Sequence, residues 1–592
     1  MPLSLFAMGT SWMNVCPSAV AFPRREDCNT LLLAILERRV YTTRTYCQQR
    51  SVPCRGAPMT LLKAPQALVY RLWEDIRQDT SELLTLFAPQ HPPKPGLYTY
   101  RIEKEGSRFR IHLRIEGDGA GVLFVDVTDV IHLNPTAAWM AKFALDGVPR
   151  AEARGSLLAY YPDASRSQLD RQLEQIYGMV ERCANPGSGC PTCNVESLSQ
   201  VPMFSTRVHA PYKVDLALTY GCNNECPHCY NEPDRLSMPS LPAESWKQIF
   251  EKLAAIGVPH FIFTGGEATL HPDLPELVAC ADSLGPIVGL NTNGRRIQNR
   301  PYMEALAQAG LNHVQVTLGS HIPEVHDAMM GAVSFHQTVR GIENALESGV
   351  HTITNTTLMR CNMDHAEEIV EFLYDLGVRT FAMNGMIYSG GGFAHPNAIP
   401  EEEMPPLLVR VRDRAAELGM RFLWYTPTEY CRMSPVELEI GAKRCNAGEY
   451  SMCVEPNGDV LPCQSYYVTA GNLLRDPWEK IWNGELFRSF RDRELDPRWA
   501  GLPEKCWDCP DLPLCGGGCR IEREAREGHR VAEGAGGGCS GCSGACGTAH
   551  HINPVHTAGF IPTESMVRAG RRATGNMSGL ISLEMLDPTT NG

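Results

Sequence analysis

The sequence predicts an α/β protein built around a partial barrel of six strand–helix units, with an α+β module before the barrel and a Cys-rich domain after it. The first observation is a strict alternation of strand-like and helix-like segments from residue 213 onward. The second is a hairpin followed by three helices within residues 100–182, and the third is a Cys- and Gly-rich stretch over residues 440–546. A chain of 592 residues is too long for one hydrophobic core, so three or four domains are expected.

The barrel is expected from the positions of its strands and helices. The strands should span residues 214–218, 261–264, 287–290, 313–318, 352–357 and 380–384, and the helices 243–256, 274–284, 302–309, 336–348 and 365–376. Strands that alternate with helices in this way form a parallel sheet. Six units give a partial (β/α)6 barrel over residues 212–400 rather than a full barrel of eight, and its site should lie at the C-terminal ends of the strands.

The part before the barrel, residues 59–195, is expected to hold a winged-helix-like module and a linker. Asn134-Pro135-Thr136 is typical of a helix start, because Asn or Thr can cap the helix and Pro fits its first turn. Strands are expected at residues 109–115 and 122–127, and helices at 137–145, 150–160 and 167–180. Cys183, Cys190 and Cys193 follow; they are either a further metal site, reactive thiols or incidental, because no fourth ligand is apparent.

The flanking segments show little pattern. We expect residues 1–58 to be a poorly structured extension, and an alternative is that translation starts at Met59, just before an amphipathic run over residues 64–87. The Cys-rich domain should span residues 401–549, and residues 550–592 are expected to form a weakly ordered tail.

Composition and charge exclude several classes of protein. The net charge of −13 argues against a nucleic-acid binder, which needs a basic face. No apolar run approaches the roughly 20 residues that a membrane span needs, and the N-terminus lacks the pattern of a secretory signal. We therefore expect a cytoplasmic protein. Its 23 cysteines, grouped at short spacings, indicate metal or cluster ligation rather than disulfides.

Three cysteines directly follow the first barrel strand, in the pattern Cys222-x3-Cys226-x2-Cys229. Three thiolates can hold three irons of a [4Fe–4S] cube and leave the fourth iron without a protein ligand. An open coordination position is typical of a catalytic metal site. A zinc site is the alternative, but zinc would require a fourth nearby Cys or His.

This loop, placed after the first strand of a six-unit barrel, resembles the signature of the radical S-adenosylmethionine (SAM) superfamily. The resemblance implies that SAM binds the open iron and that one electron from the cluster cleaves it, giving a 5′-deoxyadenosyl radical that abstracts hydrogen from a substrate. It also implies a one-electron donor such as flavodoxin or ferredoxin. His228 occupies the place where the family has an aromatic residue or His, just before the third Cys.

Further SAM contacts are implied at the ends of later strands. Gly265-Gly266-Glu267 follows the second strand and matches the family's GGE motif, which grips the amino group of SAM. Related enzymes use polar side chains at strand ends for the ribose and carboxylate of SAM. Each such residue could instead be an ordinary turn former. The candidate residues of this kind are Asn293, Ser320 and Asn355.

The C-terminal cysteines resemble the SPASM domain of radical SAM enzymes that modify peptides and proteins. The matching pattern is Cys445-x12-Gly458-x4-Cys463, then Cys506-x2-Cys509-x5-Cys515-x3-Cys519, then Cys539. The resemblance implies two auxiliary [4Fe–4S] clusters, one held by Cys445, Cys453, Cys463 and Cys519, the other by Cys506, Cys509, Cys515 and Cys539. Cys542 and Cys546 are alternatives for the last ligand, and a structural zinc ribbon is the alternative for the whole domain.

Residues 100–182 resemble the small peptide-binding domain of pyrroloquinoline quinone biosynthesis, the RiPP recognition element. The resemblance rests on strand, Asp, HLNPTAA, helix, Gly stop and two more helices. It implies that a leader peptide adds a strand to the edge of the sheet, and residues 109–115 are the expected edge. A generic winged helix for oligomer contacts or for DNA is the alternative, and the acidic charge balance disfavours DNA.

Together these features favour an oxidoreductase that crosslinks or oxidises side chains of a ribosomally made peptide. Two other radical SAM functions compete with this one. Formylglycine maturation of sulfatases is disfavoured, because Gln464 stands where those enzymes have an Asp base and an amide cannot act as a base. Modification of a haem precursor would need no peptide-binding module. A plain electron carrier is disfavoured by the open three-Cys site.

Overall fold

In the computed structural model the described residues are 91–104, 107–125, 129–185, 198–201, 204, 207–393, 395–526 and 581–585. The expectations for residues 1–58 and 64–87, and for most of the tail over 550–592, lie outside this range. So do those for Cys190, Cys193, Cys539, Cys542 and Cys546.

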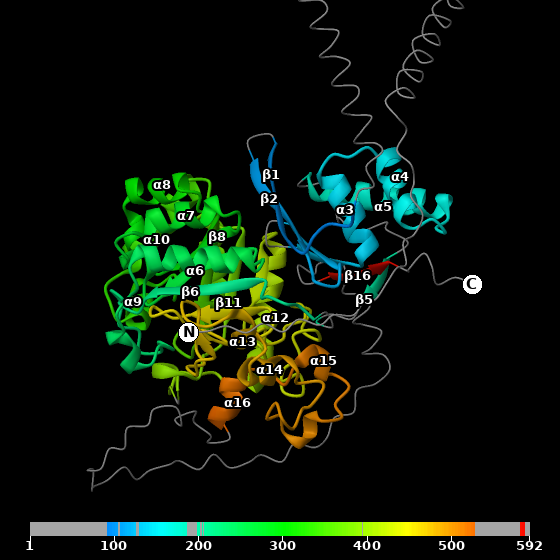
Figure 1. The fold of residues 1–592 in the computed structure, drawn as a ribbon. Helices are drawn as coiled ribbons and strands as arrows, with labels where there is room; N and C mark the ends of the chain where they lie inside the picture. The colour runs from blue at the N-terminus through cyan, green and yellow to red at the C-terminus, as the bar shows by residue number, and fades with distance from the viewer. Residues whose placement is uncertain are drawn as a thin grey trace, which may run out of the picture. The chain divides into compact units, whose positions relative to one another are not determined.

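The barrel strands occupy the predicted positions. They are β6 (Lys213–Thr219), β7 (His260–Gly265), β8 (Ile287–Thr292), β9 (His313–Thr317), β10 (His351–Thr357) and β11 (Thr380–Asn384), and neighbours pair in parallel. The helices between them are α6 (Ala243–Ala255), α7 (Leu274–Ser283), α8 (Arg300–Gln308), α9 (Pro323–Met330), α10 (Phe335–Glu347) and α11 (Ala366–Asp375). Figure 1 shows these helices on the outer side of the strands, and only the short α9 is absent from the sequence prediction.

The barrel sheet is longer than six strands. After α12 (Met404–Glu417), β12 (Arg421–Trp424) pairs in parallel with β11, and β13 (Ser451–Val454) pairs in parallel with β6. The antiparallel strands β14 (Asp459–Leu461) and β15 (Gly471–Asn472) follow β13. The expected domain boundary at residue 400 therefore falls inside one continuous sheet, which joins the Cys-rich segment to the barrel. The short helices of that segment are α13 (Trp478–Trp482), α14 (Glu485–Arg491), α15 (Leu512–Cys515) and α16 (Arg520–Arg526).

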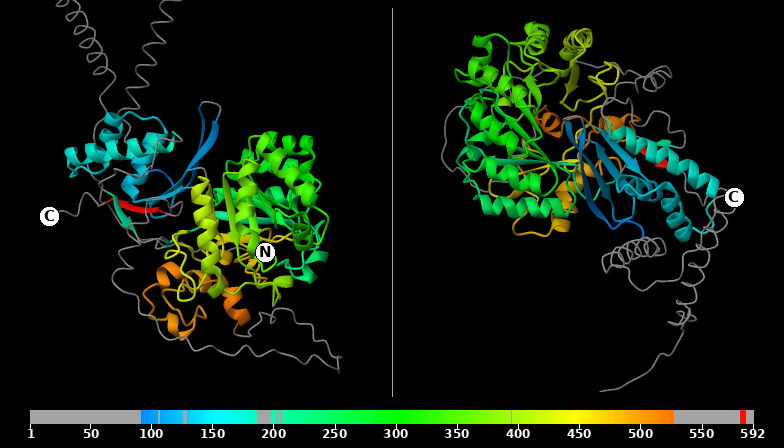
Figure 2. Two further views of the ribbon diagram at one scale, coloured as in Figure 1. Left: turned by 180° about the vertical axis from the view of Figure 1, so that it is seen from behind. Right: turned by 90° about the horizontal axis from the view of Figure 1, so that it is seen from above.

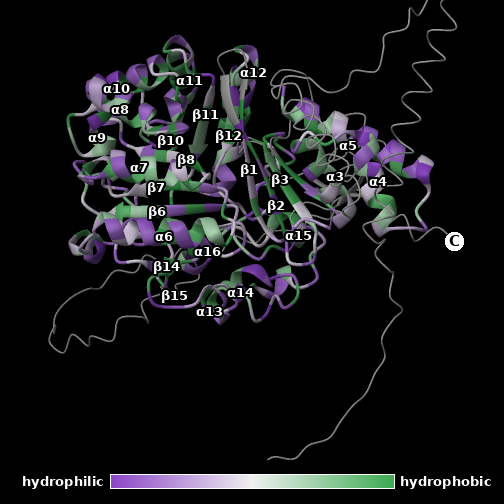
Figure 3. Cartoon of the chain, turned by 45° about the horizontal axis from the view of Figure 1, so that its top comes forward, coloured by the Kyte–Doolittle hydropathy of each residue, from purple (hydrophilic) through white to green (hydrophobic). Residues whose placement is uncertain are grey.

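One face of β6 packs in the hydrophobic core, and the other faces the barrel interior. Val214, Leu216 and Leu218 are fully buried in the core that the barrel strands share with the outer helices. Because successive side chains of a strand point to opposite faces, Asp215 and Ala217 face the barrel interior. The outer helices show both apolar and polar residues along their length, as α6 does in Figure 3, which is the pattern of a helix half-buried on a sheet.

The N-terminal module, which Figure 2 shows from two further directions, begins with a run of strands and continues with a run of helices. The strands are β1 (Gly96–Lys104), β2 (Ser107–Ile115), β3 (Gly121–Val125) and β4 (Asp129–Leu133), and the helices are α3 (Pro135–Leu145), α4 (Arg150–Tyr160) and α5 (Arg166–Cys183). The predicted helix start is confirmed, because the Asn134 side chain accepts a 2.8 Å hydrogen bond from the backbone N–H of Ala137. Gly147, the predicted stop, has a φ of +72°, which favours glycine.

The prediction that residues 109–115 form the sheet edge is wrong. The strand order is β1-β2-β3-β4-β16-β5, so β2 pairs with a strand on each side. The partner missing from the prediction is β1, although its tyrosines and Ile102 alternate with Thr and charged residues in the pattern of a strand. Beyond β4, the strand β16 (Ile581–Met585) pairs in parallel with β4 and antiparallel with β5 (Leu198–Val201). A segment near the C-terminus thus adds a strand beside β4.

Charged residues of β2 attach the module to loops of the barrel. Arg114 is fully buried, forms an ion pair with Glu116 at 2.8 Å and donates to the carbonyl oxygen of Gly257 at 3.3 Å. A ring nitrogen of His112 lies 2.9 Å from the carbonyl oxygen of Gly285. A buried cation that loses its partners is strongly destabilising, so the module and the barrel are expected to depend on each other for stability.

Candidate active site

The three cysteines of the predicted radical cluster lie on the loop that follows β6. Cys222 is exposed, and Cys226 and Cys229 are half-buried. Two later segments hold this loop by backbone hydrogen bonds. Gly391 N–H donates to the carbonyl oxygen of Cys229 at 2.7 Å, and Glu225 N–H donates to the carbonyl oxygen of Met330 at 3.1 Å. The loop is therefore fixed by the segments that follow β9 and β11.

Glycines allow the neighbouring backbone to approach this loop closely. A Cβ atom on Gly265 would lie 2.0 Å from the carbonyl oxygen of Thr219, and one on Gly266 would lie 2.3 Å from that of Tyr220. Gly390, at φ +53°, would place a Cβ atom 2.6 Å from the carbonyl oxygen of Cys229. These contacts explain why β7 ends with Gly265 and is followed by Gly266: the two glycines of the GGE motif support the cysteine loop.

We expect Gly266→Ala to remove the radical cluster. The added methyl would overlap backbone carbonyl oxygens at 2.3 and 2.6 Å, and these cannot turn away as a side chain could. Overpacking of this kind costs about 1–3 kcal/mol and shifts the backbone. Iron analysis after anaerobic reconstitution should show about four irons fewer than in the parent protein. Gly155→Ala is the matched control, because a Cβ atom there meets nothing within 4 Å; equal iron content in both variants would contradict the packing argument.

Arg295 is a site residue that the sequence analysis missed. Its guanidinium donates to the side-chain oxygen of Asn224 at 2.9 Å and to the Gln337 side chain at 2.6 Å, and it also contacts the carbonyl oxygen of Asn223. Asn293 donates to the side chain of Asn223 at 2.7 Å. The end of β8 thus holds the residues between Cys222 and Cys226. The only sequence signal was the position of Asn293 and Arg295 at a strand end.

The Glu267 carboxylate accepts four hydrogen bonds from protein donors. Its Oε1 accepts from the backbone N–H of Thr269 at 3.1 Å and from the hydroxyls of Thr269 at 2.6 Å and Thr292 at 2.7 Å. Its Oε2 accepts from the backbone N–H of Asn293 at 2.7 Å. A carboxylate has about four acceptor positions. In this arrangement Glu267 joins the end of β7 to the end of β8, so it positions the site.

The other candidate SAM residues fall into two groups. Asn293 and Ser320 make hydrogen bonds within the protein, since the Asn293 Oδ1 accepts from the backbone N–H of Arg295 at 3.0 Å and the fully buried Ser320 hydroxyl accepts from that of Ile322 at 3.1 Å. By contrast, Asn355 Oδ1 and His228 Nδ1 are buried polar atoms with no hydrogen-bond partner. Burial lowers the pKa of His228 to about 4, so its imidazole is neutral near pH 7.

These observations fit a cluster and SAM at this loop. Unpaired buried polar atoms point to a missing partner, and three thiolates with one open iron suit SAM, which supplies the 5′-deoxyadenosyl radical when bound. Within the described part of the chain, no three His, Cys, Asp or Glu side chains converge on a single metal ion.

The cysteines predicted for the first auxiliary cluster lie close enough to interact, since Cys463 is a charge neighbour of both Cys445 and Cys453, and Cys519 is one of Cys445 and Cys463. Cys445 and Cys463 pack in one apolar group with Tyr466 and Phe490. Cys453 is fully buried in another group, with Ala217, Tyr220 and Leu461. Cys453 pairs with Asp215 in the register of β13 and β6, which places it on the barrel-interior face. Its role as a cluster ligand stays a prediction.

A triple-glycine turn separates Cys515 from Cys519 in the SPASM pattern. Gly516, Gly517 and Gly518 all have positive φ, at +62°, +78° and +68°. A Cβ atom on Gly517 would lie 2.4 Å from the Leu502 side chain, and one on Gly518 would lie 2.9 Å from the backbone nitrogen of Glu429. The three residues between Cys515 and Cys519 therefore form a left-handed turn, and only glycine fits at these positions.

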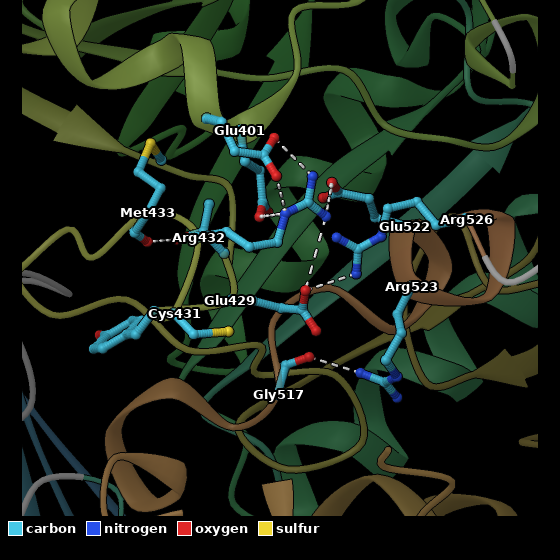
Figure 4. A network of polar contacts seen from close by, with 12 residues as sticks. Glu401, Glu429, Cys431, Arg432, Met433, Gly517, Glu522, Arg523 and Arg526 are labelled. Atoms are coloured by element: carbon cyan, nitrogen blue, oxygen red, sulfur yellow. Dashed lines mark hydrogen bonds and ion pairs between the residues drawn. The ribbon is translucent and has the colours of Figure 1, made fainter. Parts of the chain in front are cut away.

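Buried charges lie beside this turn and join the SPASM segment to the barrel (Figure 4). Arg432, in the loop after β12, donates to Glu402 at 2.7 and 2.9 Å and lies 3.5 Å from Glu401 and 4.0 Å from Glu522 of α16. Arg526 donates to Glu429 at 2.7 Å. Burial raises the pKa of both Glu401 and Glu522, and their mutual contact raises that of Glu522 further. The network fixes the loop over residues 428–432 against the cysteine turn.

The comparisons with known proteins identify the class of the chain. The sequence profile of the radical SAM superfamily matches residues 216–373, and that of the iron–sulfur cluster-binding domain called SPASM matches residues 445–510. A PqqA peptide cyclase from Xanthomonas campestris pv. campestris is 30% identical over 337 residues, which cover 54% of this chain and 85% of that relative. The chain belongs to the radical SAM superfamily and is an iron–sulfur enzyme with a SPASM domain.

Other relatives agree with this assignment. A PqqA peptide cyclase from Streptomyces rochei is 28% identical over 328 residues, covering 54% of this chain and 87% of that relative. Among solved structures, SuiB of Streptococcus suis bound to the precursor peptide SuiA has a TM-score of 0.52 at 17% identity, covering 72% of this chain and 96% of that one. SuiB bound to S-adenosylmethionine has the same TM-score at 18% identity. The likeness to SuiB shows a shared fold.

No helix among the described residues is both long and apolar enough to span a bilayer.

Proposed function

We propose that this enzyme modifies a ribosomally made peptide, forming a crosslink or oxidising a side chain through the 5′-deoxyadenosyl radical. The observation that carries the proposal is the open three-cysteine loop at the barrel mouth, in a chain whose SPASM strands continue the barrel sheet. The curated relatives are named as peptide cyclases, and a solved structure of similar fold holds a precursor peptide. A one-electron donor such as flavodoxin or ferredoxin would supply the electron, in a reducing cytoplasm that keeps the cysteine ligands as thiols.

The test is a reaction with short peptides encoded beside the gene. The reconstituted enzyme, SAM and a reductant are incubated with each peptide, and the products are analysed by mass spectrometry. A crosslink or an oxidation removes two hydrogens, so the expected product is about 2 Da lighter, with one 5′-deoxyadenosine per event. If a haem precursor changed mass while every peptide remained unmodified, the tetrapyrrole alternative would replace this proposal. Formylglycine formation stays disfavoured, because Gln464 is not a base.

The N-terminal module is proposed to bind the leader of that peptide beside β4. Backbone N–H and C=O groups along a strand edge supply affinity for an extended peptide. The β4 edge already accepts a fifth strand from a distant part of the chain, β16, in parallel register with Ile581 opposite Ile131. A leader would use the same backbone groups, so β16 and the leader are proposed to compete. Binding there raises the concentration of the core peptide near the barrel.

Removal of residues 581–592 is expected to strengthen leader binding several-fold. The reason is that a segment of the same chain competes at a high effective concentration, which is lost on truncation. Calorimetric titration of the full chain and of the truncated chain with one leader peptide measures the difference. Iron content serves as the control, because every predicted cluster ligand precedes residue 581. Equal leader affinity in both proteins would place the leader elsewhere.

A further inference from the structure

The second auxiliary cluster has three predicted ligands among the described residues, and a fourth cysteine lies beside them. Cys506 and Cys509 pack with Leu502 and Leu512, and Cys515 ends the short helix α15. The fourth cysteine is Cys431, in the loop that follows β12 of the barrel. No spacing motif includes it, so the sequence analysis assigned it no role.

Hydrogen bonds place the Cys431 loop against the cysteines of the SPASM segment. The backbone N–H of Tyr430, the residue before Cys431, donates to the Cys515 sulfur at 3.3 Å. The Cys515 thiol in turn lies 3.7 Å from the carbonyl oxygen of Thr428. Two residues of the loop therefore contact one predicted ligand directly.

Lys505 connects the same loop to the other predicted ligands. Its ammonium lies 3.6 Å from the Cys431 sulfur and 3.6 Å from the Glu429 carboxylate, and Lys505 directly precedes Cys506. Figure 4 shows the Cys431 sulfur directed to the same side of the loop as the Glu429 carboxylate. Cys431 therefore lies beside Cys506, whose preceding residue contacts the Cys431 sulfur, and beside Cys515, which the preceding residue Tyr430 contacts.

We propose that Cys431 is the fourth ligand of the auxiliary [4Fe–4S] cluster held by Cys506, Cys509 and Cys515, in place of Cys539. On ligation each thiol releases a proton and binds iron as thiolate, and four thiolates close the cluster. The Cys431 thiol is exposed, as is that of Cys222 in the radical-cluster loop, which leaves its sulfur accessible to an iron.

The rigidity of the loop favours Cys431 over a cysteine further along the chain. Arg432, the next residue, is held by Glu402 at 2.7 and 2.9 Å, and the Thr428 hydroxyl donates to the carbonyl oxygen of Met433 at 2.8 Å. Cys539 is separated from Cys519 by a stretch that includes GAGGG. Ordering a glycine-rich stretch costs conformational entropy, whereas a ligand on a fixed loop avoids that cost. Lys505 also stabilises the negative charge of the thiolates.

The experiment compares iron content among three variants of the full chain. These are Cys431→Ala, a tail variant with Cys539, Cys542 and Cys546 all changed to Ala, and the matched control Cys361→Ala, which removes another exposed cysteine. After anaerobic reconstitution the parent should hold about twelve irons in three cubes. We expect Cys431→Ala to fall to about eight, or to retain an oxidised three-iron cluster visible by electron paramagnetic resonance. The tail variant and the control should keep about twelve.

A fourth variant separates ligation from a structural role of the loop. Cys431→Asp can still bind iron through its carboxylate, so we expect it to keep the second auxiliary cluster with a shifted reduction potential, measured by spectroelectrochemical titration. The proposal is overturned if Cys431→Ala keeps all its iron, or if the cluster retained in Cys431→Asp has the parent potential. Iron loss confined to the tail variant would assign the ligand to Cys539, Cys542 or Cys546. None of these readouts depends on the peptide substrate.

Discussion

Replacing Cys222, Cys226 and Cys229 together with Ala is expected to remove about four irons and to abolish SAM cleavage completely. These three thiolates are the cysteine ligands that the loop after β6 offers to a cube. Without the cube, SAM has no open iron to bind and no source of the electron that cleaves it. The auxiliary clusters should survive, because all of their predicted and proposed ligands lie beyond β12, from Cys431 onward. Iron analysis and chromatography of 5′-deoxyadenosine measure the two effects.

The control for this triple variant is Cys361→Ala, which changes an exposed cysteine outside the loop. It should keep both the full iron content and SAM cleavage. Release of 5′-deoxyadenosine by the triple variant would show that another cluster cleaves SAM. Loss of all twelve or so irons would show instead that the auxiliary clusters also need the intact loop. The Tyr467 hydroxyl, in the SPASM segment, donates hydrogen bonds to Tyr230 and Asn231 next to the loop, and these bonds would link the two parts.

The barrel was predictable because its signals are local. Buried parallel strands such as β7 are short apolar runs, and amphipathic helices separate them, so the order of elements fixes the sheet. The role of β2 was not predictable in the same way. Whether a strand is an edge depends on distant pairing partners, and β16 joins the module sheet from residues 581–585. No local pattern contains that information.

In the candidate site, too, local patterns were predictable from the sequence and contacts between distant segments were not. Cysteine spacing predicted the radical loop, because three ligands on one short segment need no distant partner. The partners of Glu267 could not be predicted, since Thr292 and Asn293 come from the next strand. Arg295 and Cys431 are single residues outside any motif, and only the folded chain brings them to the cysteine loops. Sequence therefore identified the chemistry, and the structure identified the residues that hold it in place.

Glu267→Gln is expected to destabilise the site and to weaken SAM binding. If the new amide nitrogen replaces Oε2, it faces the backbone N–H of Asn293; if it replaces Oε1, it faces that of Thr269. Either orientation sets a donor against a donor and leaves one buried N–H unpaired. Charge-assisted hydrogen bonds contribute about 1.5–3 kcal/mol each, and an unpaired buried donor costs about 1–3 kcal/mol. The total should be about 2.5–6 kcal/mol of local stability, with a fall in SAM affinity of about a hundred-fold or more.

Thermal unfolding and equilibrium binding of SAM distinguish positioning from direct contact. Because Glu267 is buried and already accepts four hydrogen bonds, a positioning role predicts that melting temperature and SAM affinity fall together. Glu244→Gln is the matched control, since its pair with Lys247 is at the surface and contributes little. A Glu267→Gln protein that melts like the control and yet binds SAM weakly would show that the carboxylate contacts the SAM ammonium directly, with its protein donors able to find other partners.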